Sequence, residues 1–330
     1  MLSTISRLLA DVRLGDPVTD EGLTLIPVFG ELRDAPGFIT LPEALSAGTL
    51  AVTEVDAGGS VPELRARNDG KLGVLILDGE ELSGAKQNRV LNTSVFLKPG
   101  TEIPIPVSCV EQGRWRSVSE RFSDSGNVAA NKVRYAAHAS VTQNVRAHEA
   151  YHSDQGRVWQ EVTLLSGRHG VHSETSAMKD VYEQRRERLN AREVRFAAQE
   201  GQSGVLALWA GRVVGFDVVA TAAAYAHLHD RLVSSYALDA LAQTAIAGED
   251  DLRTAKEFMV SLSDAASTRH KSPGDGTSHR YTGEGFVGSA LTVNRAILHA
   301  VFFAAQDEVD PRGARSRYPT ASERRDRFNR

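Results

Sequence analysis

Five short apolar segments between residues 23 and 110 limit the folds that this chain can adopt. Each segment is three to eight residues long, and Gly, Asp, Asn or Pro residues separate it from the next. Such a pattern is typical of short β-strands in a sandwich or a partly closed barrel. A short helix, LPEALSAG, lies between the first two segments and ends at Gly48. The predicted strands are Leu23–Phe29, Leu50–Val55, Val74–Leu77, Val95–Leu97 and Ile103–Val110.

Helices and hairpins dominate the second half of the chain. The stretches VWQEVTLL and TSAMKDVYEQRRERLNAREVRFAAQ have helical character. Further helices are predicted over about residues 221–247 and 251–269, and two hairpins turn at Ala210–Gly211 and Asn294–Arg295. We therefore expect an α+β fold, in which a β-rich N-terminal half packs with a helix–hairpin–helix C-terminal half. The sequence leaves open whether the protein has one core or two.

The same pattern divides the chain into four parts. Residues 1–115 form the β-rich region, and residues 116–155 form a long polar excursion with one helix near 133–146. Residues 156–310 form the helical and hairpin region, which shares the core. Residues 311–330 contain seven Arg against Glu323 and Asp326, a net charge of +5. Without an apolar pattern, this segment is expected to be a mobile, solvated basic tail in preference to a nucleic-acid arm.

Composition excludes several classes of protein. The chain is 41% hydrophobic and 24% charged, values that are usual for a globular protein, and its net charge of −4 gives no bias toward nucleic acid or anionic membranes. Apolar residues at the N-terminus follow helical spacing, and charged residues interrupt what would be a signal peptide. No apolar run reaches the ~18 residues of a membrane span. The single cysteine, Cys109, fits a reducing, cytoplasmic setting. The sequence does not determine whether the protein forms a homo-oligomer.

The stretch LDGEELSGAKQNRVLNTSV concentrates polar side chains between two apolar segments. The preceding GVLILD is predicted to be a strand buried on both faces. The segment Gly79–Asn92 is too long for a simple hairpin connection, and a loop of that length is usually functional or mobile. It resembles a phosphate-binding loop, but Ala85 stands where the lysine belongs. Its candidate site residues are Glu80, Glu81, Lys86, Gln87, Asn88, Arg89 and Asn92.

A second polar group follows the predicted strand IPIPVSCV. Glu111, Arg114 and Trp115 lie just beyond its end. Alternation along the strand puts Cys109 on the apolar face, so this thiol is expected to be buried and unreactive. Both polar groups follow apolar strands, and we therefore expect them to lie at the same end of the β-layer and to line one polar cavity.

A third motif, HEAYH, matches the zinc-binding pattern H-E-x-x-H. On a helix, His148 and His152 would lie one turn apart and share a zinc ion, with Glu149 as general base. The context argues against this reading, because Asp154 falls where such helices stay apolar and no third histidine follows at the usual spacing. The main hypothesis therefore contains no metal or other cofactor, and zinc hydrolysis is a minor alternative.

Long motifs carry a resemblance to a known bacterial family. The segments LDGEELSGAKQNRVLNTSVFL and GTEIPIPVSCVEQGRW, together with ITLPEALSAGTLAVTEV, SDQGRVWQEV and SYALDAL, resemble the ARG and rhodanese-phosphatase-superfamily-associated protein domain. The likeness covers about residues 23–241. This family is found beside ADP-ribosylglycohydrolases, so the resemblance implies a role in NAD or ADP-ribose metabolism.

A nucleotide-like ligand would match the candidate residues. Glu80, Glu81 and Glu111 could supply acid and base for cleavage at a ribose. Lys86, Arg89 and Arg114 could bind a pyrophosphate, and Trp115 could stack on adenine. Asn88 and Asn92 could bind ribose hydroxyls, with Gln87 beside them. The alternative is a binding or scaffold module in which the same polar residues form a structural network without chemistry.

Overall fold

The computed structural model describes residues 3–56, 58–148 and 150–305. The basic segment 311–330, which the sequence predicts to be a mobile tail, lies outside these described residues.

The larger sheet is antiparallel and combines strands from both ends of the chain. Its order is β1-β3-β13-β14-β18-β17-β16-β15, and β2 pairs with β3 beside this path. Val28 of β3 lies opposite Gly204 of β13, so the N-terminal strands complete a sheet built mostly by the C-terminal half. The strands are β1 (Arg13–Leu14), β2 (Val18–Asp20), β3 (Leu23–Phe29), β13 (Gln202–Trp209), β14 (Arg212–Val219), β15 (Ala266–Lys271), β16 (Thr277–Gly283), β17 (Phe286–Val293) and β18 (Ala296–Ala304).

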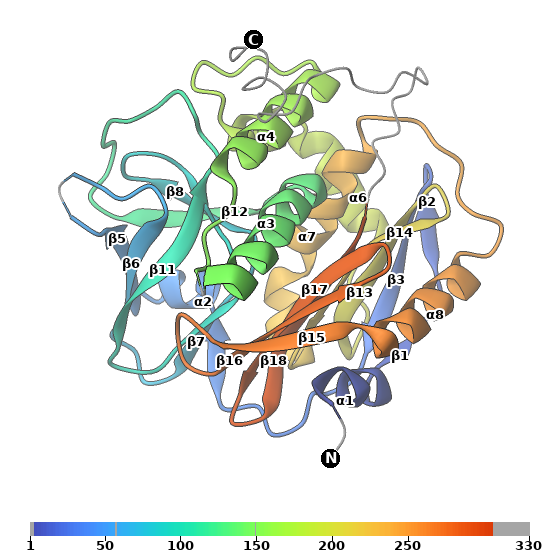
Figure 1. Cartoon of the computed structure of the whole chain (residues 1–330). Coiled ribbons are helices and arrows are strands. Elements are labelled where there is room, and N and C mark those ends of the chain that lie inside the picture. The colour runs from blue at the N-terminus through green and yellow to red at the C-terminus, as the bar shows by residue number, and fades with distance from the viewer. Residues whose placement is uncertain (1–2, 57, 149, 306–330) are drawn as a thin grey trace, which may run out of the picture.

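Two smaller sheets form the rest of the β-structure and curl into half a barrel. The three-stranded sheet has the order β10-β7-β4, with β4 parallel to β7, and the six-stranded sheet has the order β12-β8-β9-β11-β6-β5. Figure 1 shows the six-stranded sheet on the left and the larger sheet on the right. The strands are β4 (Phe38–Thr40), β5 (Leu50–Glu54), β6 (Glu63–Asn68), β7 (Gly73–Ile76), β8 (Glu80–Gly84), β9 (Arg89–Leu91), β10 (Val95–Leu97), β11 (Glu102–Cys109) and β12 (Phe122–Val128).

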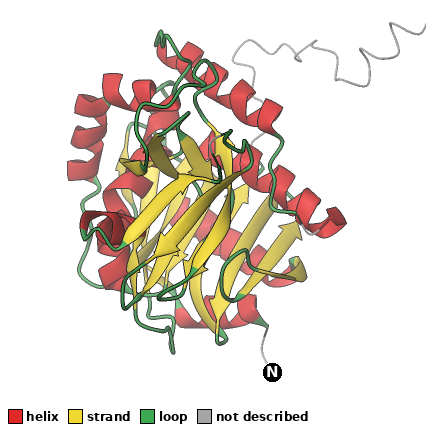
Figure 2. Cartoon of the chain, turned by 90° about the vertical axis from the view of Figure 1, so that its left-hand side faces the viewer, coloured by secondary structure: helices red, strands yellow, loops and turns green. Residues whose placement is uncertain are grey.

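Helices join the half-barrel to the larger sheet. The long helix α7 contacts β13 of the larger sheet and β12 of the half-barrel, while α3 contacts α4, α7 and β17. Figure 2 shows the strands in the middle of the molecule with helices on several sides. The helices are α1 (Thr4–Asp11), α2 (Leu41–Ser46), α3 (Asn131–His148), α4 (Gln155–His169), α5 (Met178–Gln184), α6 (Arg186–Arg195), α7 (Ala222–Ala240) and α8 (Asp251–Ser261), followed by a 3-10 turn, η1 (Leu262–Asp264).

Two main hydrophobic clusters answer the question of one core or two. The larger cluster joins the larger sheet to the helices α3 to α8. The smaller cluster fills the half-barrel, and its buried residues run from Leu41 to Phe122. The expected α+β class therefore agrees with the structure, and each half has an apolar interior of its own.

Local sequence signals explain several elements that were predicted correctly. Thr40 and Glu43 form a capping box at the start of α2, in which the Thr40 amide donates to Glu43 Oε2 at 2.8 Å. Asp154 caps α4 through its side chain. The β13–β14 hairpin turns at Ala210 and Gly211, whose φ angles of 51° and 75° suit a two-residue hairpin turn. The β17–β18 hairpin also turns at the expected residues, Asn294 and Arg295.

Other predictions were wrong in an instructive way. The polar segment Gly79–Asn92 is not an open loop, because β8 and β9 make it a hairpin with Glu81 opposite Val90. The polar excursion contains strand β12 as well as helix α3. The helix predicted over residues 251–269 ends at Ser261, and residues 266–271 form strand β15.

A buried ion pair lies where the half-barrel, the helices and the larger sheet meet. Arg134 of α3 donates to Asp217 of β14 through Nη2 at 2.8 Å and Nη1 at 3.0 Å, and both side chains are fully buried. Its Nε also lies 3.5 Å from Asp78 of the half-barrel. Burial alone would raise the pKa of Asp217, but the charge of Arg134 lowers this pKa below its ordinary value. Gly79, with a φ angle of 82°, lies so close to Arg134 that a Cβ atom would approach it to 2.8 Å.

We expect Arg134→Met to lower the free energy of unfolding by about 3–5 kcal/mol, since it leaves Asp217 buried without its cation. Urea unfolding monitored by circular dichroism measures the change. The control is Arg67→Met, which removes an ion pair to Asp69 whose side chains are 49% and 54% exposed. That change should cost less than about 1 kcal/mol. Equal losses in the two variants would contradict the central role of Arg134.

Candidate functional site

The two polar segments that the sequence singled out lie against each other. The Asn88 amide donates to Glu111 Oε2 at 3.0 Å, and Arg114 Nη1 donates to the Ala85 carbonyl at 2.6 Å. The hairpin β8–β9 and residues 111–115 are therefore neighbours at one end of the half-barrel, as expected. Their contact is a packed, hydrogen-bonded junction, and the polar cavity expected there stays a prediction.

Glu111 and Arg114 form a bidentate ion pair within this junction. Arg114 Nε and Nη2 donate to the two Glu111 oxygens at 2.8 and 2.6 Å, and other Arg114 donors reach backbone carbonyls of the hairpin. Thr175 adds a hydrogen bond to Glu111 Oε1 at 2.9 Å. Burial would raise the pKa of Glu111, but hydrogen bonds from Arg114 and the Asn88 amide lower it. This geometry fits a structural clamp better than a catalytic acid.

Glu80 and Glu81 alternate along β8 and have different partners. Glu80 accepts from the Leu77 amide at 2.7 Å and lies 3.3 Å from Arg231 of α7. Glu81 accepts from Asn127 Nδ2 at 3.1 Å. Burial raises the pKa of each carboxyl to about 7, a value at which a carboxyl can exchange a proton near neutral pH. Both are fully buried, however, and neither lines the open hollow beside Lys86.

The amides of the hairpin have structural partners as well. Gln87 Oε1 accepts from Arg89 at 2.9 Å. Asn88 Oδ1 accepts from the Gly84 amide and closes the β8–β9 turn. Asn92 Nδ2 donates to the Tyr151 carbonyl at 3.0 Å and ties the half-barrel to the segment after α3.

Trp115 and two cations form the most open part of the predicted site. The Trp115 side chain is 48% exposed. Lys86 Nζ lies 5.4 Å and Arg89 Cζ lies 5.5 Å from the centre of its ring, within the range of cation–π attraction. Arg89 is buried, its Nε has no hydrogen-bond partner among the described residues, and burial lowers its pKa. This group can offer an aromatic face together with positive charge.

An open hollow of about 430 Å³ lies beside Lys86. Glu54, at the end of β5, accepts from the Lys86 amide at 3.2 Å and forms part of the wall. The sequence did not predict that Glu54 lines this hollow. No residue pattern indicated that the end of β5 lies beside the β8–β9 turn. The lining residues are Thr53, Glu54, Asp56, Ala85, Lys86, Ser117, Ser119 and Glu120.

Comparison with known proteins supports the resemblance found in the sequence. The model of the ARG and Rhodanese-Phosphatase-superfamily-associated Protein domain, ARPP-1, matches residues 11–303. The chain belongs to this family. No curated protein and no solved structure matches the chain. The family match spans both the half-barrel and the larger sheet, so the ARPP-1 domain includes both apolar clusters.

The HEAYH motif of this ARPP-1 domain does not have the helical geometry that a shared zinc would need. Helix α3 ends at His148, and His152 lies beyond it, 3.8 Å from Glu63. Glu149 lies outside the described residues. Within residues 3–56, 58–148 and 150–305, no group of three or more His, Cys, Asp and Glu is arranged to hold a metal ion.

A buried Ser–His–Asp chain was not anticipated from the sequence. Ser94 Oγ lies 2.7 Å from His299 Nδ1, and His299 Nε2 lies 3.3 Å from Asp217. The residue types match a nucleophile, base and orienting acid. All three are buried, Asp217 is bound to Arg134, and Ser94 also accepts from the Asp78 amide. Ser94, His299 and Asp217 therefore belong to the structural network between the sheets.

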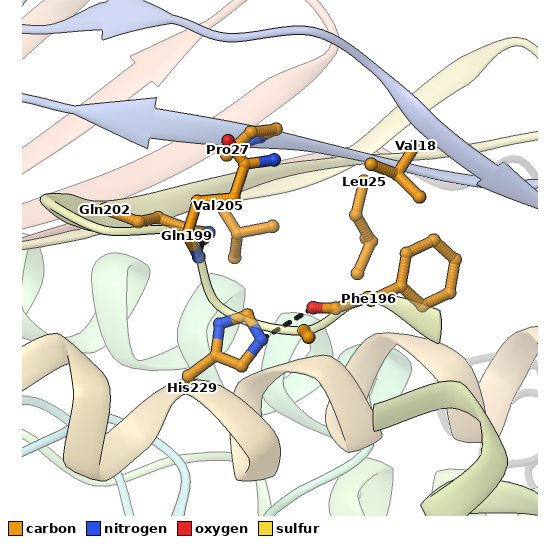
Figure 3. A pocket seen from close by; sticks show the side chains of 9 residues that line it. Val18, Leu25, Pro27, Phe196, Gln199, Gln202, Val205 and His229 are labelled. Carbon is orange, nitrogen blue, oxygen red and sulfur yellow. Dashed lines mark hydrogen bonds between the residues drawn. The ribbon is translucent and has the colours of Figure 1, made fainter. Parts of the chain in front are cut away.

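A further small hollow lies between β3, β13 and α7, and the His229 side chain in its wall has hydrogen-bond partners within the protein. Figure 3 shows His229 pointing toward Phe196, whose carbonyl lies 2.7 Å from His229 Nε2. His229 Nδ1 lies 3.0 Å from the Tyr225 hydroxyl. The cavity measures only about 20 Å³, enough for about one water molecule. It is too small for a nucleotide.

The raised pKa of Glu81 has a consequence for stability. Its pKa rises from 4.5 to about 7 on folding, so the neutral acid stabilises the folded state below about pH 4.5. This contribution is lost as the pH rises through about 7. Glu81→Gln mimics the neutral acid, so we expect the free energy of unfolding to decrease less between pH 5 and 8 in this variant than in the wild type. At about pH 8, its free energy of unfolding should exceed that of the wild type by up to roughly 3 kcal/mol. Thermal unfolding between pH 5 and 8 measures this, with exposed Glu200→Gln as the control. An unchanged pH profile in Glu81→Gln would refute the expectation.

Cys109 should label slowly despite a cationic neighbour. Its thiol is buried, as the sequence predicted, and Arg89 Nη1 contacts Sγ. Burial excludes the reagent from the thiol until the structure opens. An aromatic disulfide reagent should therefore react at least about a hundredfold faster after unfolding in urea than before. Fast labelling of the folded chain at neutral pH would contradict this.

Proposed function

We propose that the protein binds an ADP-ribosyl or other nucleotide ligand at Trp115, Lys86 and the adjoining hollow. The observation that carries the proposal is an exposed aromatic ring next to positive charge. The exposed Trp115 ring offers a stacking surface for a base. Lys86 and Arg89 place positive charge at that ring for phosphates.

The acidic side of the hollow suits the remaining part of such a ligand. Glu54, Asp56 and Glu120 line it together with Lys86. Carboxylates accept hydrogen bonds from ribose hydroxyls and from an adenine amino group, whereas they would repel phosphates. A ligand with hydroxyl donors at one end and phosphates at the other therefore fits better than inorganic phosphate alone.

We restrict the proposal to binding. Glu80 and Glu81 are fully buried, and Glu111 is held by Arg114, so these three carboxylates have no described route to a ligand beside Trp115. The family description supports a connection with ADP-ribosylglycohydrolase systems, in which a binding protein would act as a sensor or adaptor. A reducing, cytoplasmic setting would bring the protein together with such ligands.

A scaffold without a ligand is the second candidate, because a specific observation favours it. The polar residues of the β8–β9 hairpin and residues 111–115 mostly satisfy one another, as the Glu111–Arg114 pair illustrates. Such a network can lock two layers of a protein together without binding anything.

Within the described residues, no helix is both long and apolar enough to cross a membrane.

Ligand binding can separate the two candidates. We expect ADP-ribose or NAD at about tenfold its dissociation constant to raise the melting temperature by about 3 °C. Trp115→Ala and Lys86→Gln should each weaken binding about tenfold or more, since stacking or a charge-assisted contact is lost. The control Lys256→Gln removes an exposed lysine on α8 and should leave binding unchanged.

Calorimetry and product analysis complete this test. No turnover of NAD or ADP-ribose should occur during a long incubation with the protein. Absence of binding of either ligand at millimolar concentration would refute the proposal and favour the scaffold. Turnover that disappears in Glu80→Gln or Glu81→Gln would instead restore the catalytic role that the sequence suggested for these residues.

A further inference from the structure

Arg280 of β16 is a fully buried cation without a carboxylate partner. Its Nη2 donates to Thr93 Oγ1 at 2.7 Å. The three N–H groups on Nε and Nη1 find no hydrogen-bond acceptor among the described residues. No Asp or Glu in that part of the chain forms an ion pair with Arg280, whose pKa is lowered by burial.

Three of the other four buried arginines among the described residues pair with carboxylates, whereas Arg89 contacts Gln87 and the Cys109 thiol instead. Arg134 pairs with Asp217, Arg114 with Glu111, and Arg192 with Asp20 and Glu21. A buried guanidinium stays charged, and removing it from water is unfavourable unless an opposite charge or several acceptors compensate. At Arg280, the described compensation is the hydrogen bond to Thr93, the ring of Tyr151 at 5.3 Å from Cζ, and the charge of Asp78, which forms no ion pair with it.

Tyr151 separates this guanidinium from a large open hollow. The hollow measures about 480 Å³, and Tyr151 forms part of its wall. The Tyr151 hydroxyl donates to the Lys271 carbonyl at 2.8 Å, which holds the ring against Arg280. Contact between Arg280 and a molecule in the hollow therefore requires the Tyr151 ring to turn aside.

The walls of the hollow suit an anion with an apolar body. Ser272 lines it, is almost fully buried, and has an Oγ atom without a hydrogen-bond partner among the described residues. Among the described lining residues, His152, His270 and Lys271 add basic groups, and Glu63 is the one carboxylate. The apolar part of the wall comes from Pro104, Pro106 and Pro273.

We propose that this hollow and Arg280 form a binding site for a small organic oxyanion, separate from the surface at Trp115. The carboxylate or phosphoryl group of the ligand binds Ser272 Oγ and, once Tyr151 has turned, the free N–H groups of Arg280. The apolar body of the ligand rests on the prolines. The bound anion supplies the negative charge that Arg280 lacks in the protein.

Phenyl phosphate and benzoate are suitable probes, because each joins an oxyanion to a small ring. In a chloride buffer of constant ionic strength, either probe at about tenfold its dissociation constant should raise the melting temperature by about 3 °C. Phenol, which lacks the anion, should not do so. A response to phenyl phosphate alone assigns the ligand to phosphate esters, and a response to benzoate alone assigns it to carboxylates.

Arg280→Met should abolish the response and should leave the unliganded protein at least as stable as the wild type, because it replaces an uncompensated buried charge by an apolar chain. The matched control is Arg269→Met on the neighbouring strand β15. Arg269 is exposed and lies opposite His279, one position out of phase with Arg280, so its side chain points to the other face of the sheet. Trp115→Ala should also retain the full response, which keeps this site distinct from the proposed nucleotide surface.

Ser272→Ala keeps the proposal testable if Arg280→Met does not fold. This small change should weaken probe binding about threefold to tenfold without altering the melting temperature of the free protein. Unchanged affinity in Ser272→Ala, or an unchanged response in folded Arg280→Met, would overturn the proposal. So would a wild-type protein that responds to neither anion at about 50 mM, well above ordinary metabolite-site dissociation constants.

Discussion

The ion pair between Arg134 and Asp217 is the interaction on which the joining of the two halves depends. Arg134 comes from a helix, Asp217 from the larger sheet, and the neighbouring Asp78 from the half-barrel. His138 adds a contact to Asp78 at 2.9 Å, and Tyr236 of α7 donates to Asp217. Apolar packing could hold these layers at several relative positions, whereas bidentate hydrogen bonds fix direction as well as distance. The buried charges therefore set the orientation of one apolar cluster on the other.

The segment that follows β9 extends this junction along the chain. Asn92 binds the Tyr151 carbonyl, Thr93 binds Arg280, and Ser94 binds both the Asp78 amide and His299. Three consecutive polar residues thus contact three different parts of the molecule. Arg89, just before them, reaches toward Trp115. The polar stretch Leu77–Val95 mostly binds other parts of the protein, whereas Lys86 is partly exposed and lies at the exposed Trp115 ring.

The pattern of short apolar runs predicted β3, β7 and β11 well, because these strands bury hydrophobic side chains. It failed for β8, where Glu80 and Glu81 are both buried and no hydrophobic period exists to detect them. The proximity of the two polar segments was predictable, since both follow strands of one layer. Their partners were not predictable, because the pairing of Arg114 with Glu111 depends on side-chain directions that sequence spacing does not contain. Nothing in the sequence context of Arg280 indicated that it is buried without a carboxylate partner.

The path of the chain through the larger sheet also bears on how the protein is made. Strand β3 can pair with β13 only after β13 has been synthesised, since Val28 lies opposite Gly204. All strands of the half-barrel lie between β3 and β13 in the sequence. The half-barrel has an apolar interior drawn only from residues between Leu41 and Phe122, so it can condense from a contiguous stretch of chain. Contacts that are close in sequence form quickly, and domains condense in order as a ribosome releases them. The emerging chain can therefore complete the half-barrel while β3 still lacks β13, and this edge of β3 can pair with another chain until β13 has been made.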